Sequence, residues 1–174
     1  MEFAQETYRK EMRDLLRAAH DAAQRRLGDE LIYTISIWTD PDAAMSAVSI
    51  DTREHSLAHI AALSSWAHEQ VAKYSGTMEN ELEEALLNLP DRDINPANFA
   101  YVDLAIKRHV SFPHDWAAET DGACWQYLGP ALQTVAEEAL QLFAASPLDP
   151  EAEVGVNAAN DWYAGRRRIV SRAT

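Results

Sequence analysis

The stretch LIYTISIW at residues 31–38 decides the fold of this chain. Its residues are mostly β-branched or aromatic, which are the types that strands favour. One set of alternating positions is wholly apolar or aromatic, and the other set still carries Ile32 and Trp38. A strand that is apolar on both faces is typical of the centre of a sheet, where other elements cover it from both sides. We therefore predict a central strand over residues 31–38.

The residues on either side of this strand predict its first neighbours. Downstream, a Pro-Asp turn at residues 39–43 leads into a second strand over residues 44–50, and the two strands form an antiparallel hairpin. Upstream, bulky apolar residues recur every three or four positions over residues 3–27, and Gly28 follows them. This spacing predicts an amphipathic helix that ends at a glycine cap.

The rest of the chain completes the pattern of an α+β protein. We expect helices over residues 52–74, 79–89 and 129–143, strands over residues 99–110 and 153–157, and a loop over residues 111–121. The segment 99–110 also fits a short helix, and the segment 160–174 fits either a helix or a tail.

The predicted fold is a single α+β domain over residues 1–174. A small antiparallel sheet with an N-terminal hairpin packs in it against several amphipathic helices. A basic C-terminal tail, free to fray, follows over about residues 164–174.

Charge is distributed unevenly along the chain. The whole chain has 15 basic and 28 acidic residues, a net charge of −13. The segment 27–165 holds 5 of the basic and 23 of the acidic residues, which gives it a net charge of −18. Such a surface repels phosphate backbones and anionic lipids, and it accelerates association with basic partners. The composition therefore disfavours nucleic-acid and membrane binding and favours a basic protein partner, although acidic residues also serve plain solubility.

Several common motifs of enzymes and binding proteins are missing from the sequence. It contains no glycine-rich phosphate loop, no Gly-x-Ser-x-Gly elbow and no aspartate-rich calcium loop. The single cysteine, Cys124, allows no intrachain disulfide and no cysteine-based zinc site, and its apolar neighbours indicate a buried, inert thiol. No signal peptide or long apolar run is present. We expect a cytoplasmic protein without a cofactor.

Two groups of histidines have a spacing or a neighbour that metal sites or catalytic sites use. His55 and His59 lie four residues apart on a predicted helix, a spacing that metal sites use, but no third ligand is near them in sequence. His109, His114 and Asp115 are the alternative, a small hydrolase-like site in which a histidine acts as general base. No nucleophile motif accompanies them, so exposed loop residues beside a buried Trp116 are the simpler interpretation.

An acidic strip is the stronger candidate for function. Its residues lie on and after the short helix at 79–89, and one exposed aromatic side chain, Trp66, is predicted on the preceding helix. The strip consists of Glu79, Glu81, Glu83, Glu84, Asp91 and Asp93. Runs of charge usually form a solvated face, and the functional alternative is a surface that attracts a basic protein, with Trp66 as an anchor.

The first third of the chain resembles a known family. The residues that carry the likeness are the first helix, the segment ELIYTISIWTD at 30–40, and the segment DTRE at 51–54 that opens the next helix. Over about residues 1–60 they are similar to bacterial proteins of the DUF4303 type, a domain of unknown function. Such proteins resemble immunity proteins encoded beside polymorphic toxins. The likeness implies a non-enzymatic antitoxin that neutralises a toxin domain, and it carries over no functional residue.

Overall fold

The computed structural model describes residues 2–74, 76–118 and 122–169. Its sheet has the strand order β3-β2-β1-β4-β5, with β1 (Ile32–Asp40) in the centre. Its neighbours are β2 (Met45–Thr52), which is antiparallel, and β4 (Leu148–Ala158), which is parallel. The outer strands β3 (Tyr101–Arg108) and β5 (Asp161–Arg168) pair antiparallel to β2 and β4. The predicted central strand and hairpin are therefore confirmed.

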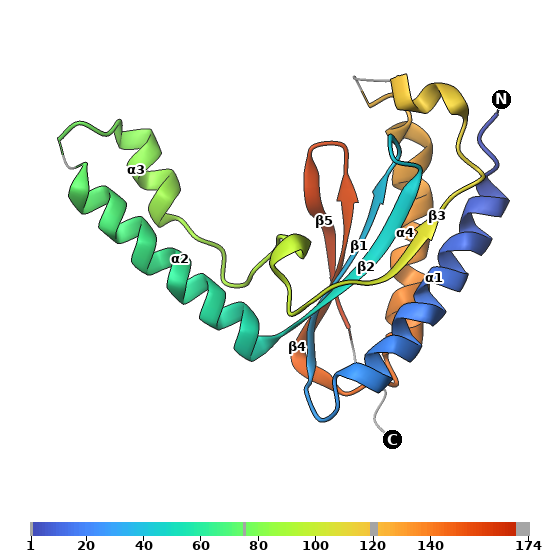
Figure 1. Cartoon of the computed structure of the whole chain (residues 1–174), viewed down its shortest axis with the longest axis horizontal. Coiled ribbons are helices and arrows are strands. Elements are labelled where there is room, and N and C mark those ends of the chain that lie inside the picture. The colour runs from blue at the N-terminus through green and yellow to red at the C-terminus, as the bar shows by residue number, and fades with distance from the viewer. Residues whose placement is uncertain (1, 75, 119–121, 170–174) are drawn as a thin grey trace.

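Two long helices cover one face of the sheet (Figure 1). The helix α1 (Gln5–Arg26) lies over β2 and β3, and α4 (Trp125–Phe143) lies over β4. Their apolar stripes meet the isoleucines and valines of the strands in one core. The periodicity of α1 predicts its buried side chains correctly, since Tyr8, Met12 and Leu16 are all at most 2% exposed. The prediction for α4 missed its first turn, which begins four residues before Gly129.

The opposite face of the sheet is polar and aromatic. The segment that follows α3 crosses it and includes a short 3-10 helix, η1 (Pro96–Asn98). Arg92 from this segment is buried with its guanidinium 4.0 Å from the ring centre of Tyr33, and Arg53 lies 4.5 Å from the same ring. Arg53 also donates to both carboxylate oxygens of Asp149, at 2.7 and 2.6 Å. Paired charges and cation–π contacts therefore replace a second apolar core on this face.

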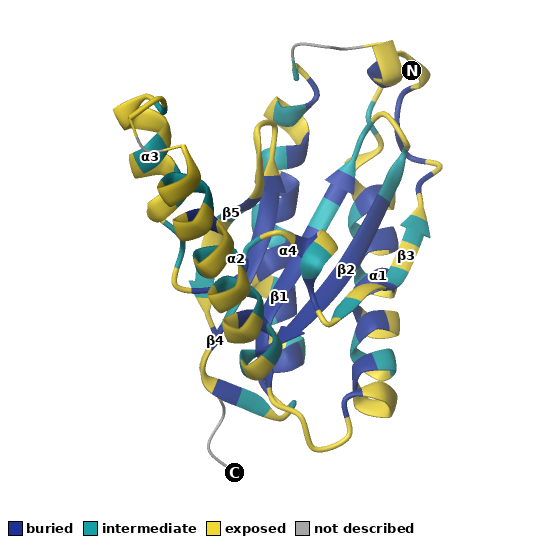
Figure 2. Ribbon diagram, turned by 60° about the vertical axis from the view of Figure 1, so that its left-hand side comes forward, coloured by how far each residue is buried: buried dark blue, intermediate teal, exposed yellow. Residues whose placement is uncertain are grey.

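Two helices extend away from the body (Figure 1). The helix α2 (Arg53–Lys73) begins directly after β2 with Thr52 as its cap, and α3 (Asn80–Leu87) packs back along it. We call this helical pair, residues 53–74 and 76–87, the arm. The apolar residues of α2 have the spacing of a buried stripe, but Ser56 and Ala67 are the only residues of this helix that are buried. The exposed surface of the arm is visible in Figure 2.

The ambiguous segments are now resolved. Residues 101–108 form a strand, as the alternation favoured, and Asp103 bulges out of it with a φ of 47°. The segment 114–118 forms a 3-10 helix, η2 (His114–Ala118), inside the predicted loop. The expectation of a helix or tail over 160–174 is wrong for residues 161–168, which form β5 because they pair with β4. Residues 119–121 and 170–174 lie outside the described part of the chain. Within that part, none of the helices is both long and apolar enough to cross a membrane.

Gly155 in β4 provides a test of the polar face. A Cβ atom at this position would lie 2.2 Å from the ring of Tyr163 on β5, so the Gly155→Ala variant forces the ring to move. We expect the free energy of unfolding to fall by about 1–3 kcal/mol, as overpacking of a core does. Gly129→Ala in α4 is the matched control, because nothing lies within 4 Å of its added Cβ.

Urea denaturation of the two variants measures the difference. The Gly129→Ala control should change stability by less than about 0.5 kcal/mol, because the helix preference of alanine is opposed by the restriction that Pro130 places on the residue before it. A Gly155→Ala variant as stable as the wild type would show that Tyr163 does not pack over β4.

Candidate functional site

Four of the six acidic candidates gather at the start of α3. Glu79 precedes the first residue of α3, and Glu81, Glu83 and Glu84 lie in its first two turns. None of the four takes part in an ion pair within the described residues. The positive end of the helix dipole stabilises carboxylates at this position, which offsets part of their mutual repulsion. The arm therefore presents a compact group of negative charges at its outer end.

Asp91 and Asp93 do not belong to that group. The carboxylate of Asp91 lies 3.7 Å from the guanidinium of Arg166 on β5. The Asp93 side chain is only 4% exposed and contacts the ring of His59. In addition, the backbone N–H of Asp93 donates to Ser56 at 2.8 Å. Asp93 thus fastens the base of α2 to the segment that crosses the sheet, and it offers no charge to the solvent.

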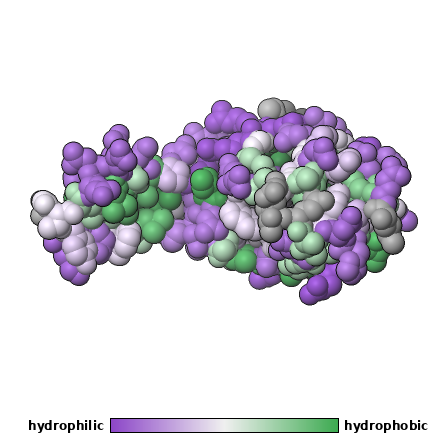
Figure 3. Space-filling model, turned by 90° about the horizontal axis from the view of Figure 1, so that it is seen from above, coloured by the Kyte–Doolittle hydropathy of each residue, from purple (hydrophilic) through white to green (hydrophobic). Residues whose placement is uncertain are grey.

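Apolar side chains accompany the glutamates on the arm. Trp66 is 52% exposed, which confirms the prediction that it faces solvent. The other large apolar side chains of the arm that are at least two-fifths exposed are Leu57, Tyr74, Leu82 and Leu87. Seen from above, apolar side chains form a continuous area along the arm with polar side chains at its border (Figure 3). Contiguous exposed apolar surface with a polar rim marks interaction sites.

His55 and His59 are held separately by carboxylates. His55 Nδ1 lies 2.8 Å from Asp51 Oδ1, which also accepts the backbone N–H of Ala100 at 3.0 Å. Burial raises the pKa of Asp51, and these contacts oppose that rise. His59 contacts Asp93. Across the described ranges, no three histidine, cysteine, aspartate or glutamate side chains converge as metal ligands would. The two histidines instead secure the junction between the arm and the body.

The alternative site of His109, His114 and Asp115 is not assembled. His114 and Asp115 lie exposed in η2, beside the buried Trp116. The His109 side chain is fully buried and bonds to other residues, namely Glu11 and Ser46. Cys124 is buried, in agreement with the sequence.

The contacts of His109 belong to a buried chain of hydrogen bonds that the sequence analysis missed. The hydroxyl of Tyr8 lies 2.8 Å from that of Thr39, and Thr39 lies 2.6 Å from Ser46. Ser46 Oγ is 2.7 Å from His109 Nε2, and His109 Nδ1 is 2.8 Å from Glu11. The chain joins α1, β1, β2 and the residues after β3. Its one sequence signal is Glu11, a charged residue on the apolar face of the first helix.

Glu11 lies at one end of this chain and is surrounded by hydrogen-bond donors. The carboxylate also accepts the Ser111 hydroxyl at 2.9 Å and the backbone N–H of Val110 at 3.3 Å. Burial on its own would raise the pKa of Glu11, but these hydrogen bonds, with that from His109, outweigh it and hold the pKa below its ordinary value. Burial also lowers the pKa of His109, against the opposing effect of Glu11. A neutral His109 then donates from Nδ1 to Glu11 and accepts the Ser46 hydroxyl at Nε2.

This order of serine, histidine and carboxylate is that of a catalytic triad, but its setting is not. Ser46 is fully buried. A nucleophile needs room for a substrate carbonyl and donors for the oxyanion. The chain therefore stabilises the fold.

Comparisons with protein-family models, curated proteins and solved structures found no match to this chain.

Replacing Glu11 by Gln tests the buried chain. The variant loses the charge that accepts three donors, and we expect its free energy of unfolding at pH 7 to fall by about 2 kcal/mol. Glu137→Gln, on the exposed face of α4, is the control and changes stability by less than about 0.5 kcal/mol. Urea denaturation at several pH values gives both numbers.

The pH dependence supplies a second measurement. Because the pKa of His109 is lowered from 6.5, the wild type begins to lose stability as the pH falls below 6.5. The lowered pKa of Glu11 adds a further loss as the pH falls below 4.5. The loss below pH 4.5 is absent in Glu11→Gln. The difference in the free energy of unfolding between wild type and variant therefore becomes smaller in acid. A constant difference would contradict the ionised state of Glu11.

Proposed function

We propose that this protein acts by binding another protein through its arm, and that the partner presents a basic surface. The observation that carries the proposal is that one projecting element combines exposed apolar side chains with glutamates that form no ion pair within the described residues. Each is common on a protein surface by itself, but together they form the apolar centre and charged border of an interface. Trp66 is the expected anchor, since tryptophan is enriched among residues that dominate binding energy.

The contrast with the body of the protein supports this assignment. On the sheet, Glu153 accepts from Arg166 at 2.8 Å, and Glu137 on α4 accepts from Arg167 at 3.0 Å. The negative charges of the arm have few basic residues near them in sequence, because residues 53–87 include six acidic and only two basic residues. One of the two, Arg53, is already bound to Asp149 and Glu151 on β4. Negative potential thus concentrates on the arm, where it steers a basic partner.

Neutralisation of a toxin is the biological role that we infer for this binding. Toxin domains that cut nucleic acid need basic surfaces for their substrate, and an acidic inhibitor that covers such a surface associates rapidly. The likeness of residues 1–60 to DUF4303-type, immunity-like proteins points to the same role. The alternative hydrolase site is not favoured, because His109 is buried against Glu11 and Ser46 while His114 and Asp115 are exposed in η2.

Charge reversal on the arm tests the proposal. The partner is first isolated by affinity purification from the native cell, and its association rate with the purified protein is measured at several salt concentrations. Changing the four glutamates Glu79, Glu81, Glu83 and Glu84 to lysine should slow association by at least about tenfold at low salt and flatten its salt dependence. The same four changes at exposed carboxylates near α1, Glu2, Glu6, Asp14 and Asp21, alter the net charge equally. If this control slows association as much, the arm does not steer the partner.

Trp66→Ala separates anchoring from steering. The side chain is 52% exposed, so its loss should change the free energy of unfolding by less than about 0.5 kcal/mol. Loss of an interface anchor should cost about 2 kcal/mol or more of binding, mainly as faster dissociation. Unchanged dissociation kinetics would place the interface elsewhere.

A further inference from the structure

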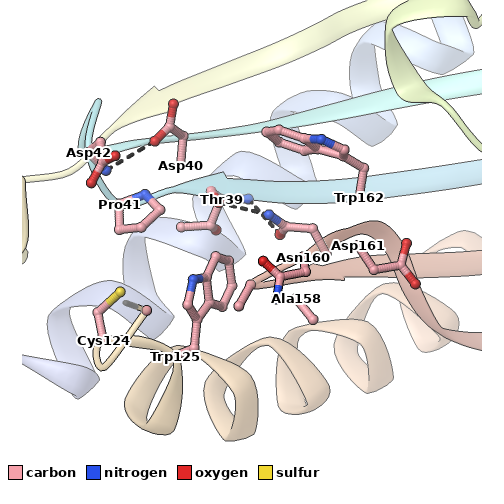
Figure 4. A pocket seen from close by; sticks show the side chains of 13 residues that line it. Thr39, Asp40, Pro41, Asp42, Cys124, Trp125, Ala158, Asn160, Asp161 and Trp162 are labelled. Atoms are coloured by element: carbon pink, nitrogen blue, oxygen red, sulfur yellow. Dashed lines mark hydrogen bonds between the residues drawn. The ribbon is translucent and has the colours of Figure 1, made fainter. Parts of the chain in front are cut away.

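A cavity of about 520 Å³ lies where the parallel strands β1 and β4 end and α4 begins (Figure 4). The end of β1 and the turn after it contribute Asp40 and Asp42 to its wall, the first turn of α4 contributes Trp125, and the start of β5 contributes Asp161 and Trp162. These residues are far apart in sequence, and the fold brings them to one end of the sheet. The crevice beyond the carboxyl ends of strands is a common place for ligands in sheets with parallel strands.

The carboxylates of this cavity are fixed in position but are not neutralised. Asp40 Oδ1 accepts the backbone N–H groups of Asp42 and Ala43 at 3.0 and 3.2 Å, and Asp161 Oδ1 accepts that of Tyr163 at 2.9 Å. Each of these two carboxylates keeps its second oxygen for another donor. In the described part of the chain, neither they nor Asp42 form an ion pair with lysine or arginine. Glu153 and Asp149, elsewhere on this sheet, do form such pairs.

Indole rings provide the remaining walls. Trp125 and Trp162 flank the strand ends (Figure 4). Trp162 is 56% exposed, and its ring is held edge-on against that of Trp38, with the ring centres 6.1 Å apart at 85°. An indole that is held in place and open to solvent offers its face to a cation. Asp40 and Trp162 also line a second cavity of about 330 Å³, whose other walls are mostly apolar.

The spacing of the carboxylates distinguishes between kinds of cation. Within the described residues, no three acidic, histidine or cysteine side chains are close enough together to hold a metal ion. A cation that contacts all three aspartates must therefore extend between them. The start of α4 adds a partial positive charge of about half a unit, which the three carboxylates exceed. An anionic ligand is unfavourable at this site for the same reason.

We propose that this cavity binds an extended organic cation of the alkylammonium or guanidinium class. Its charged groups hydrogen bond to the open oxygens of Asp40, Asp42 and Asp161, and one of them lies on the face of Trp162. A free polyamine and the side chain of a lysine- or arginine-rich partner share this chemistry. The site is separate from the arm and does not depend on the function proposed for it.

Isothermal titration calorimetry on the whole protein tests the proposal with spermidine and agmatine as probes and magnesium chloride as the inorganic control. We expect saturable binding of at least one organic cation with a Kd below about 1 mM, and magnesium should not compete at equal ionic strength. A short peptide with two arginines distinguishes the source. If the peptide binds more tightly than the free amines, the cavity receives a partner's side chain, and the reverse order assigns a free polyamine.

Two variants locate the binding. Asp42→Asn removes a carboxylate that accepts no hydrogen bond from the turn within the described residues, and it should weaken binding about fivefold or more. Trp162→Leu removes an exposed ring and should weaken it about threefold to thirtyfold. Glu81→Gln on the arm makes the same change of charge as Asp42→Asn and should leave Kd unchanged. Circular dichroism confirms that each variant is folded.

Three results would overturn the proposal. They are the absence of saturable heat with every organic probe at millimolar concentration, equal displacement by magnesium, and equal weakening by Glu81→Gln. The arm variants and the cavity variants are measured separately, so the failure of either proposal leaves the other intact.

Discussion

The strand β1 must be covered on both faces, and the two faces are covered by different means. Its isoleucines meet α1 and α4 in an apolar core. On the other face, Tyr33 lies between the guanidinium groups of Arg53 and Arg92, and the crossing segment after α3 takes the place of a helix layer. Because that one segment is sufficient, α2 and α3 are not needed to cover the sheet. They are left as an arm whose apolar side chains have no counterpart in the body.

The sequence predicts correctly those elements in which the pattern of apolar residues matches the side chains that the fold buries. Residues 31–38 are apolar on both faces, and the first helix shows a clean stripe, so both were recognisable. The elements that were predicted wrongly have a common physical cause. Their structure depends on contacts with residues that are distant in sequence. Residues 161–168 are polar and rich in arginine, and they form a strand only because β4 supplies the ladder and Glu153 supplies a counter-charge. The apolar residues of α2 resemble a core stripe although the fold leaves them exposed.

In the candidate site, too, some features follow from the local sequence and others depend on distant contacts. The position of the α3 glutamates and the exposure of Trp66 follow from local sequence. The separation of Asp93 from them does not, because it depends on contacts with His59 and Ser56 across the base of the arm. The basic C-terminal residues are distant in sequence from the acidic middle, yet on β5 they neutralise part of it. Among the described residues, acidic side chains without an ion pair therefore form one group on the arm and another at the strand ends around Asp40.

The bulge at Asp103 has a further consequence for the rim of the sheet. An outer strand offers unpaired amides and carbonyls to any other chain, and regular rims promote polymerisation into fibres. At Asp103 the backbone takes a φ of 47°, and its N–H donates to the Ser49 hydroxyl. The regular spacing of backbone donors and acceptors, which an incoming strand would have to match, is therefore interrupted. The other rim, β5, carries the charged side chains of Arg166, Arg167 and Arg168, which an incoming strand would have to accommodate. Both rims thus resist self-association, and a chain with so much exposed apolar surface on its arm gains a safeguard against aggregation.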